Sequence, residues 1–190
     1  VFVMSNPPYA KASVPGFETS SCGDLFAFFT ERTATTSKGF ITVTPAAWMS
    51  RGKFQPLREV LSRRPGGRVW SFDNSPDTLF TGFKHGSTNT SKRNFVRAAI
   101  TVCRPDDTTW QTSPLVRWNV AERPAMLARV RDLLSPLNIG PHGEWVKGFA
   151  GLEDAWSHLA TAPRRLADLV SQQPTGITLS LGLTGRYYSS

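Results

Sequence analysis

The feature that most constrains this chain is the stretch Ser5-Asn6-Pro7-Pro8-Tyr9, directly after the short apolar run at residues 1–4. The apolar run predicts a buried strand. Two successive prolines have fixed φ angles and no backbone N–H, so the chain leaves this strand as a stiff, extended loop with open carbonyl groups. In an α/β sheet, ligands bind just outside the carboxyl ends of the strands. The sequence therefore predicts a binding site at residues 6–9, called here the 6–9 loop.

The rest of the first hundred residues alternates between helix and strand patterns. Asp24 opens and caps an amphipathic helix to about residue 35, in which Leu25, Phe28 and Phe29 form the predicted apolar face. The other elements predicted in this part are a strand at 40–44, a helix at 52–64, a strand at 68–72 and a strand at 95–102. This order predicts an open α/β sheet that is mostly parallel, with an antiparallel edge hairpin.

The second part of the chain has a different character, and we expect a mainly helical segment there. The predicted elements are a strand at 115–120, a helix at 122–137, a loop at 139–151, two short helical stretches at 152–162 and 164–171, and a weak strand at 177–183. We therefore predict two parts, with 1–106 as one domain and 107–190 as a mainly helical segment.

The 6–9 loop has side chains suited to binding an amino group. The side-chain oxygen of Asn6 and the carbonyl of Pro7 are two neighbouring acceptors, and together they can hold both hydrogens of an NH₂ group conjugated to a ring. Tyr9 adds a flat face on which a heterocycle can stack. The exocyclic amino group of a base that is flipped out of its helix fits this description. The alternatives are a proline-stiffened strand exit with a capping Asn, or a proline-rich ligand segment.

Charge and cysteine usage limit the class of partner. The net charge of +8 and the pI of about 10.1 favour an anionic partner, of which nucleic acid is the commonest, although a solvated basic surface has the same signature. Cys22 and Cys103 match no metal or redox spacing, which predicts buried thiols and no metal site. No apolar run is long enough to span a membrane, so we expect a cytoplasmic protein.

These motifs resemble those of the S-adenosylmethionine-dependent methyltransferases that act on adenine N6, in particular the large restriction-modification and phage-exclusion enzymes. The resemblance covers residues 1–105, and its most specific part is Asn6-Pro7-Pro8-Tyr9. Further matching segments, in chain order, are Asp24-Leu25-Phe26, Phe40-Ile41-Thr42-Val43-Thr44-Pro45 with Trp48, Phe54-x-x-Leu57-Arg58, Phe72-Asp73-Asn74 and Leu79-Phe80-Thr81-Gly82-Phe83. The resemblance implies the second half of a Rossmann-like methyltransferase sheet. It also implies that residues 1–106 are a partial methyltransferase catalytic domain and that residues 107–190 are a helical spacer or the start of a target-recognition region.

The resemblance also implies roles for particular residues. Asn6, Pro7 and Pro8 would form the catalytic loop, with Asn6 and the Pro7 carbonyl on the amino group of adenine, and Tyr9 would stack on the flipped base. Phe80 or Phe83 would close the other side of the base pocket. Candidate phosphate contacts on double-stranded DNA are Lys11, Lys84, Lys92 and Arg93. The implied reaction is in-line transfer of the sulfonium methyl group to the adenine amine.

One departure from the family concerns the cofactor S-adenosylmethionine. Members carry a glycine-rich loop that follows an apolar strand and opens a helix, whereas the dense glycine clusters here, at 65–67 and 148–151, have no such context. We therefore expect the donor site to come from a missing N-terminal half, a complementary methyltransferase half or a longer parent chain. Two other functions stay open: a protein-glutamine N-methyltransferase, and a non-catalytic remnant or DNA-binding scaffold.

Overall fold

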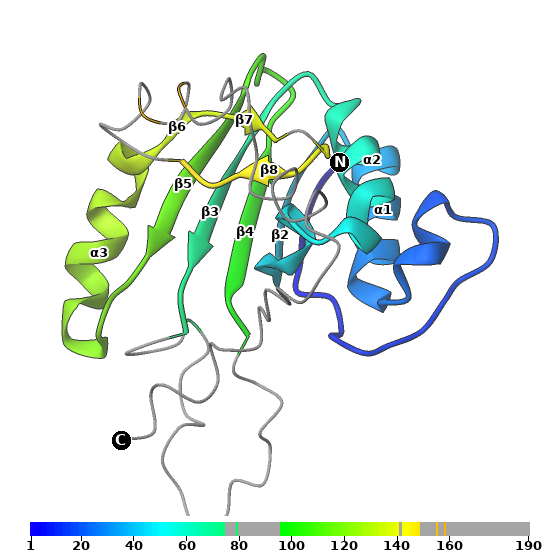
Figure 1. Cartoon of the computed structure of the whole chain (residues 1–190), viewed down its shortest axis with the longest axis horizontal. Helices are drawn as coiled ribbons and strands as arrows, with labels where there is room; N and C mark the ends of the chain where they lie inside the picture. Colours follow the sequence, from blue (N-terminus) through cyan, green and yellow to red (C-terminus); the bar gives the residue numbers. More distant parts are fainter. Residues whose placement is uncertain (75–78, 80–95, 141, 149–154, 156–157, 159–190) are drawn as a thin grey trace, which may run out of the picture. The chain divides into compact units, whose positions relative to one another are not determined.

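The computed structural model describes residues 1–74, 79, 96–140, 142–148, 155 and 158 (Figure 1). The chain divides into two compact units, Val1–Glu153 and Asp154–Ser190, and the elements described below all belong to the first. The helical stretches expected at 152–171 lie almost entirely outside the described residues, and the strand expected at 177–183 lies wholly outside them. The predicted functional division at residues 106 and 107 stays a prediction.

A six-stranded mixed sheet forms the centre of the first unit, with the strand order β1-β2-β4-β3-β5-β6 (Figure 1). The strands are β1 (Phe2–Ser5), β2 (Gly39–Pro45), β3 (Gly67–Phe72), β4 (Ala98–Cys103), β5 (Trp110–Val116) and β6 (Ser135–Pro136). β1 is parallel to β2 and β3 is parallel to β5, while β4 lies between β2 and β3 and is antiparallel to both. β6, at the edge of the sheet, is antiparallel to β5. The predicted α/β fold is confirmed, and an antiparallel strand lies inside the sheet as well as at its edge.

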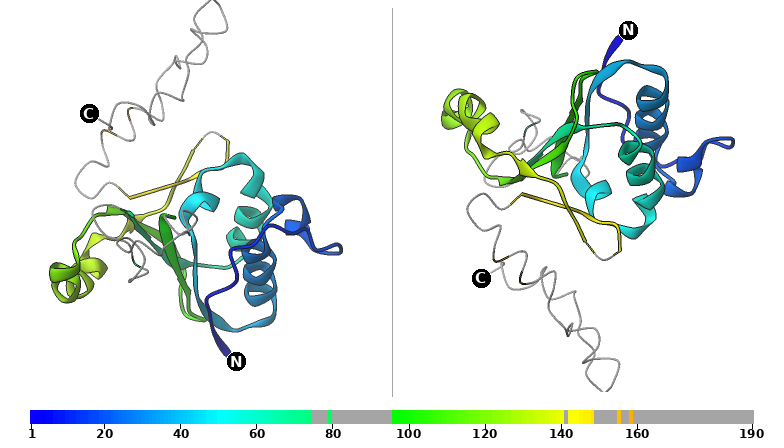
Figure 2. Two further views of the ribbon diagram at one scale, coloured as in Figure 1. Left: turned by 90° about the horizontal axis from the view of Figure 1, so that it is seen from below. Right: turned by 90° about the horizontal axis from the view of Figure 1, so that it is seen from above.

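Two helices cover one face of this sheet, α1 (Leu25–Thr36) and α2 (Gln55–Ser62), and Figure 2 shows them side by side. Short 3₁₀ helices precede α1 at Glu18–Cys22 and connect β2 to α2 at Ala46–Met49 and Gly52–Phe54. Alternate residues of the strands, such as Phe40, Val69 and Ala99, point towards the helices and are fully buried with Phe26 and Leu57. This main core fixes where β1 and β2 end.

The opposite face carries a second, smaller core. Phe72 and Val116 pack there against Met126 of α3 (Arg123–Arg129) and Val130 of the 3₁₀ helix Val130–Leu133, and the indole N–H of Trp70 donates to the Val130 carbonyl at 3.0 Å. The long helix predicted at 122–137 is therefore only partly correct. It is divided into two short helices and then joins β6.

A small hairpin of β7 (Asn138–Ile139) and β8 (Trp145–Val146) replaces the loop predicted at 139–151. Trp145 is 2% exposed and packs edge-on against Trp48 and Trp110, with ring centroids 5.3 and 4.6 Å apart. Because Trp48 and Trp145 both belong to the main core, the hairpin lies on the same face of the sheet as α1 and α2. The glycine-rich sequence around Trp145 predicts a loop, but this tryptophan belongs to the main core.

Two predictions about burial are wrong. β1 is an edge strand with β2 as its one described neighbour, and its Phe2 and Met4 side chains are exposed. In α1 the buried side is formed by Phe26, Ala27, Thr30, Glu31, Thr33 and Ala34. The predicted Leu25, Phe28 and Phe29 face is half-buried or exposed, because Phe28 packs on Phe17 of the preceding loop and Phe29 packs on Phe28.

Candidate functional site

The 6–9 loop begins where β1 ends at Ser5, at the carboxyl edge of the parallel pair β1 and β2. Asn6 and Pro8 are exposed, Pro7 is buried and Tyr9 is 38% exposed. The rigid prolines therefore anchor the loop at Pro7 and present the side chains of Asn6 and Tyr9 at the surface. This is the position that the sequence predicted for the loop.

Tyr9 ties the loop to itself and to the neighbouring strand. Its hydroxyl lies 3.2 Å from Oδ1 of Asn6 and 3.2 Å from the backbone carbonyl oxygen of Val43 in β2. Burial raises the pKa of Tyr9 to about 12, so the hydroxyl stays protonated at neutral pH. Its single proton is donated to Oδ1 of Asn6 or to the Val43 carbonyl, or is shared between these two oxygens.

The carbonyl oxygen of Pro7 accepts no hydrogen bond from any residue that the structure describes. Oδ1 of Asn6 has two lone pairs, of which the Tyr9 hydroxyl occupies one at most. Two adjacent residues therefore keep acceptor capacity for an outside donor. Binding of an amino group by this pair stays a prediction.

A cavity of about 270 Å³, here called the Tyr9 cavity, lies beside this loop. Phe26, Phe54 and Pro45 supply its apolar walls, and its charged lining residues are Lys11, Asp24, Arg51 and Lys53. Of the predicted phosphate contacts, Lys11 is the one that the structure places here. The basic residues Arg51 and Lys53 were missed, because the segment between β2 and α2 matched no motif of charged residues.

Asp24 stands at the N-cap of α1 but does not cap it, so that predicted role is wrong. Its carboxylate is bound instead by the ammonium of Lys53, which also lies 4.5 Å from the ring centroid of Phe54. A full positive charge competes better for a carboxylate than a backbone N–H does. Asp24 thus joins the wall of the Tyr9 cavity to α1.

The connection between Tyr9 and α1 is fastened by a buried glutamate. The carboxylate of Glu31 accepts hydrogen bonds from the backbone N–H groups of Glu18 and Thr19, at 3.1 and 2.8 Å, and from the Thr19 hydroxyl at 2.7 Å. Glu18 and Thr19 are the first residues of the 3₁₀ helix Glu18–Cys22. A carboxylate at the first turn of a helix accepts from the free N–H groups there and interacts favourably with the helix dipole. The connection is thereby docked on α1 rather than left loose over the site.

The remaining predicted site residues lie outside the described residues: Phe80, Phe83, Lys84, Lys92 and Arg93. Their roles at the base pocket and on DNA stay predictions.

Comparisons with known proteins give a likeness of fold. No protein-family model matches the sequence, and no curated protein matches it significantly. Among solved structures, the DrdV–DNA complex matches with a TM-score of 0.48 at 13% identity, over 76% of this chain and 18% of that chain. A modification subunit of a putative type I restriction enzyme from Vibrio vulnificus YJ016 matches with a TM-score of 0.45 at 10% identity, over 77% of this chain and 36% of that one.

The ATP-dependent type ISP restriction-modification enzyme LlaBIII bound to DNA matches with a TM-score of 0.46 at 11% identity, over 76% of this chain and 12% of that chain. The present chain thus spans between 12% and 36% of the length of these three proteins.

The described residues do not fit the methionine half of S-adenosylmethionine. β1 leads to α1 through the proline loop, and β2 leads to α2 through Pro45 and two 3₁₀ helices, so neither connection is glycine-rich. Gly66 and Gly67 lie between α2 and β3, and a Cβ there would come within 2.4 Å of the Thr109 nitrogen and 2.5 Å of the Trp110 ring. These two glycines therefore serve internal packing rather than a ligand.

The described part of the chain holds no group of three His, Cys, Asp or Glu side chains able to bind a metal ion. Cys22 and Cys103 are buried free thiols, as predicted, and burial raises the pKa of Cys103 to about 12. No helix among the described residues is long and apolar enough to cross a membrane.

Proposed function

We propose that this chain carries the target-amine site of a site-specific DNA methyltransferase that modifies adenine at N6. The observation that carries the proposal is the pair of acceptors with spare capacity at the end of β1, Oδ1 of Asn6 and the carbonyl of Pro7. Both hydrogens of the adenine amine can be accepted there, which fixes the nitrogen and directs its lone pair away from the ring. Tyr9 offers its ring to the flipped base.

The charge beside the loop supports DNA as the substrate. Lys11, Arg51 and Lys53 line the Tyr9 cavity, and Asp24 is the one acidic residue among its described lining. A protein-glutamine amide would present the same NH₂ group, but a glutamine side chain needs no cationic surroundings. A nucleotide brings phosphates with its base, and phosphates supply most of the affinity of DNA-binding proteins.

In this proposal the methyl donor, S-adenosylmethionine, binds outside the residues that the structure describes. A complementary methyltransferase half or a longer parent chain would supply its site. The position of β1 supports this, because it is an edge strand whose Phe2 and Met4 side chains are exposed. An exposed strand edge is a template for adding another strand. The cellular setting would be restriction-modification or phage defence in the cytoplasm.

The test is methyl transfer to DNA by the full chain together with its donor-binding half. Labelled S-adenosylmethionine and a pool of adenine-containing duplexes are the substrates, and Asn6→Ala is the variant. We expect the variant to lose transfer by on the order of 10²-fold, because one of two positioning contacts is gone. Lys38→Gln, an exposed change at the amino end of β2, is the control and should keep the wild-type rate.

Two results would contradict the proposal. Transfer that survives Asn6→Ala would remove the loop from the reaction. Label that accumulates on a glutamine-containing protein substrate, and not on the duplex pool, would replace DNA by a protein amide as the substrate.

A further inference from the structure

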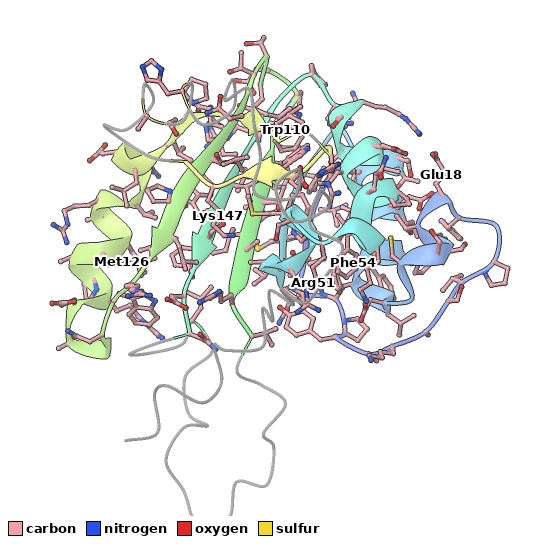
Figure 3. The ribbon with its side chains drawn as sticks, viewed as in Figure 1. Glu18, Arg51, Phe54, Trp110, Met126 and Lys147 are labelled. Atoms are coloured by element: carbon pink, nitrogen blue, oxygen red, sulfur yellow. The ribbon has the colours of Figure 1, made fainter. Side chains whose placement is uncertain are left out.

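A second cavity, of about 390 Å³, lies next to the Tyr9 cavity and shares Ala47, Arg51 and Val96 with it. Its basic lining residues are Arg51, Arg97 and Lys147, and none of its described lining residues is acidic. We call it the basic cavity. Figure 3 shows Arg51 beyond the end of β2 and Lys147 on the segment after β8, so distant parts of the sequence supply the cations.

Lys147 is held in place by hydrogen bonds on both sides. The carbonyl of Val146 accepts from the Thr112 hydroxyl at 2.9 Å, and the N–H of Gly148 donates to the Ser113 carbonyl at 2.9 Å. A Cβ at Gly148 would come within 2.3 Å of the Thr112 carbonyl oxygen, so the chain approaches β5 as closely as glycine allows. The backbone at Lys147 is therefore set by the sheet itself.

Arg97 is positioned equally firmly. Its guanidinium Nε donates to the buried carboxylate of Asp73 at 2.9 Å, and its carbonyl accepts from the N–H of Ala46 at 2.7 Å. The other oxygen of Asp73 accepts from Nε of Arg117 at 2.8 Å. One carboxylate is thus shared between two guanidinium groups, so a net positive charge remains at this edge of the cavity.

Arg51 is placed by the buried side chain of Arg58. Nη1 of Arg58 donates to the carbonyls of Trp48 and Arg51, at 2.7 and 2.9 Å, while its Nε donates to the carbonyl of Gly143 in the β7–β8 hairpin at 2.6 Å. One side chain therefore ties the segment that carries Arg51 to the hairpin that leads to Lys147. The spacing of these two cations is built into the fold.

Arg51 and Lys147 are cations without a direct acidic partner among the described residues. Neither side chain forms an ion pair with any residue that the structure describes. Partial burial, followed by the positive charge of Arg97, lowers the pKa of Lys147 below its usual value. An ammonium group that is partly desolvated beside a like charge gains from any anion that enters.

We propose that the basic cavity binds a backbone phosphate of the DNA strand that carries the target nucleotide, through Arg51, Arg97 and Lys147. The inference rests on the proposed function, because the shared walls put this cavity next to the residues assigned to the base. A phosphate bound there would fix the sugar-phosphate chain beside the Tyr9 cavity. Phosphate contacts of this kind set register and orientation without reading sequence.

The experiment measures binding of the full chain to a fluorescently labelled duplex by anisotropy at several KCl concentrations. Each phosphate contact contributes about one unit to the slope of log affinity against log salt. We expect Lys147→Gln to weaken binding at low salt and to reduce this slope by about one, and we expect Lys147→Arg to restore it. Lys38→Gln is the matched control and should behave as the wild type, and thermal melting verifies that the variants fold.

A second duplex, of the same sequence but with purine, which lacks the 6-amino group, in place of each adenine, separates this inference from the proposed function. The Lys147→Gln effect should be equal on both duplexes, while Asn6→Ala should weaken binding of the adenine-containing duplex alone. If Asn6→Ala has no effect on either duplex while Lys147→Gln weakens both, the phosphate site stands and the adenine site falls. If Lys147→Gln matches Lys38→Gln, or if the wild type binds no DNA, the phosphate site is overturned.

Inorganic phosphate tests a free anion as the alternative ligand. If calorimetry shows phosphate binding that Lys147→Gln abolishes, while affinity for DNA is unchanged by the same substitution, the cavity serves a free phosphate and the DNA assignment is wrong. If added phosphate displaces DNA from the wild type but not from Lys147→Gln, the assignment to DNA is supported.

Discussion

The hydroxyl of Tyr9 lies 3.2 Å from Oδ1 of Asn6, so a hydrogen bond joins the residue that we propose for stacking on the base to the residue that we propose for binding its amine. The same hydroxyl reaches the Val43 carbonyl at 3.2 Å, which ties the pair to β2. Tyr9 therefore has two separable functions, one of its ring and one of its hydroxyl.

Tyr9→Phe and Tyr9→Ala distinguish these two functions. Tyr9→Phe keeps the ring and loses the hydrogen bonds, so we expect it to lower the free energy of unfolding by about 0.5–1.5 kcal/mol and to keep most of the preference for adenine-containing DNA. Tyr9→Ala also removes the stacking face, which costs about 1–3 kcal/mol in binding a base. Urea unfolding measures the change in stability, and anisotropy on the adenine-containing duplex measures the change in binding. Equal binding by the two variants would exclude stacking by Tyr9.

Asp73 predicts a pH dependence of stability. Burial raises the pKa of this carboxyl, but hydrogen bonds from Arg97, the Asn74 N–H and Arg117 outweigh burial and leave the pKa below its ordinary value of 3.8. A carboxyl with a lowered folded-state pKa stabilises the fold above its unfolded pKa. That stability is lost as the pH falls from about 4 through the lower folded-state value.

Asp73→Asn should therefore lower the free energy of unfolding at pH 7 by roughly 1–3 kcal/mol, because it leaves two guanidinium groups without their carboxylate. The difference between the variant and the wild type should shrink as the pH falls below 4. Urea unfolding at pH 7, 4 and 3 is the measurement, with the exposed Asp106→Asn as control. A difference that does not change with pH would contradict the low pKa.

Much of the fold is predictable from sequence, since proline and glycine boundaries and β-branched runs locate β2, β3 and β4 to within a few residues. The buried face of α1 is not, because its inward positions include polar residues that find local partners. Thr30 donates its hydroxyl to the Phe26 carbonyl at 2.7 Å, and Glu31 binds the turn at Glu18 and Thr19. The pattern of apolar residues does not indicate polar side chains that are buried with hydrogen-bond partners.

The candidate site divides in the same way. The 6–9 loop could be identified from the sequence because the residues that define it are four consecutive ones. The basic cavity is not, because Arg51, Arg97 and Lys147 come from three separate segments and converge only when the sheet and the β7–β8 hairpin have formed. Single surface-type cations have no pattern in the sequence that marks them.

Arg58 lies within α2 and Arg63 directly follows this helix, but the two should respond differently to substitution. Arg58 is 2% exposed and serves three carbonyl groups, so Arg58→Met leaves buried acceptors without a donor and should cost roughly 2–5 kcal/mol. Arg63 pairs with Glu18 at 2.5 Å at the surface, and Arg63→Met should cost less than about 1 kcal/mol. Chemical unfolding measures both. Equal costs would show that Arg58 does not join the two segments.

Glu31 provides the last test, since its carboxylate fastens the connection between Tyr9 and α1 by three hydrogen bonds. Glu31→Gln keeps the size of the side chain but replaces one acceptor oxygen by a donor that faces an N–H, so we expect a loss of about 1–3 kcal/mol in unfolding free energy. The connection should also open locally more often and be cut faster by a protease of broad specificity. Glu59→Gln on α2 changes an exposed carboxylate that binds Gln55, and it should alter neither quantity. If the Glu31→Gln variant is instead cut no faster than Glu59→Gln while its unfolding free energy falls, Glu31 stabilises α1 alone. The connection is then held by its other contacts, such as the hydrogen bond that the Leu25 N–H donates to the Ala10 carbonyl at 2.9 Å.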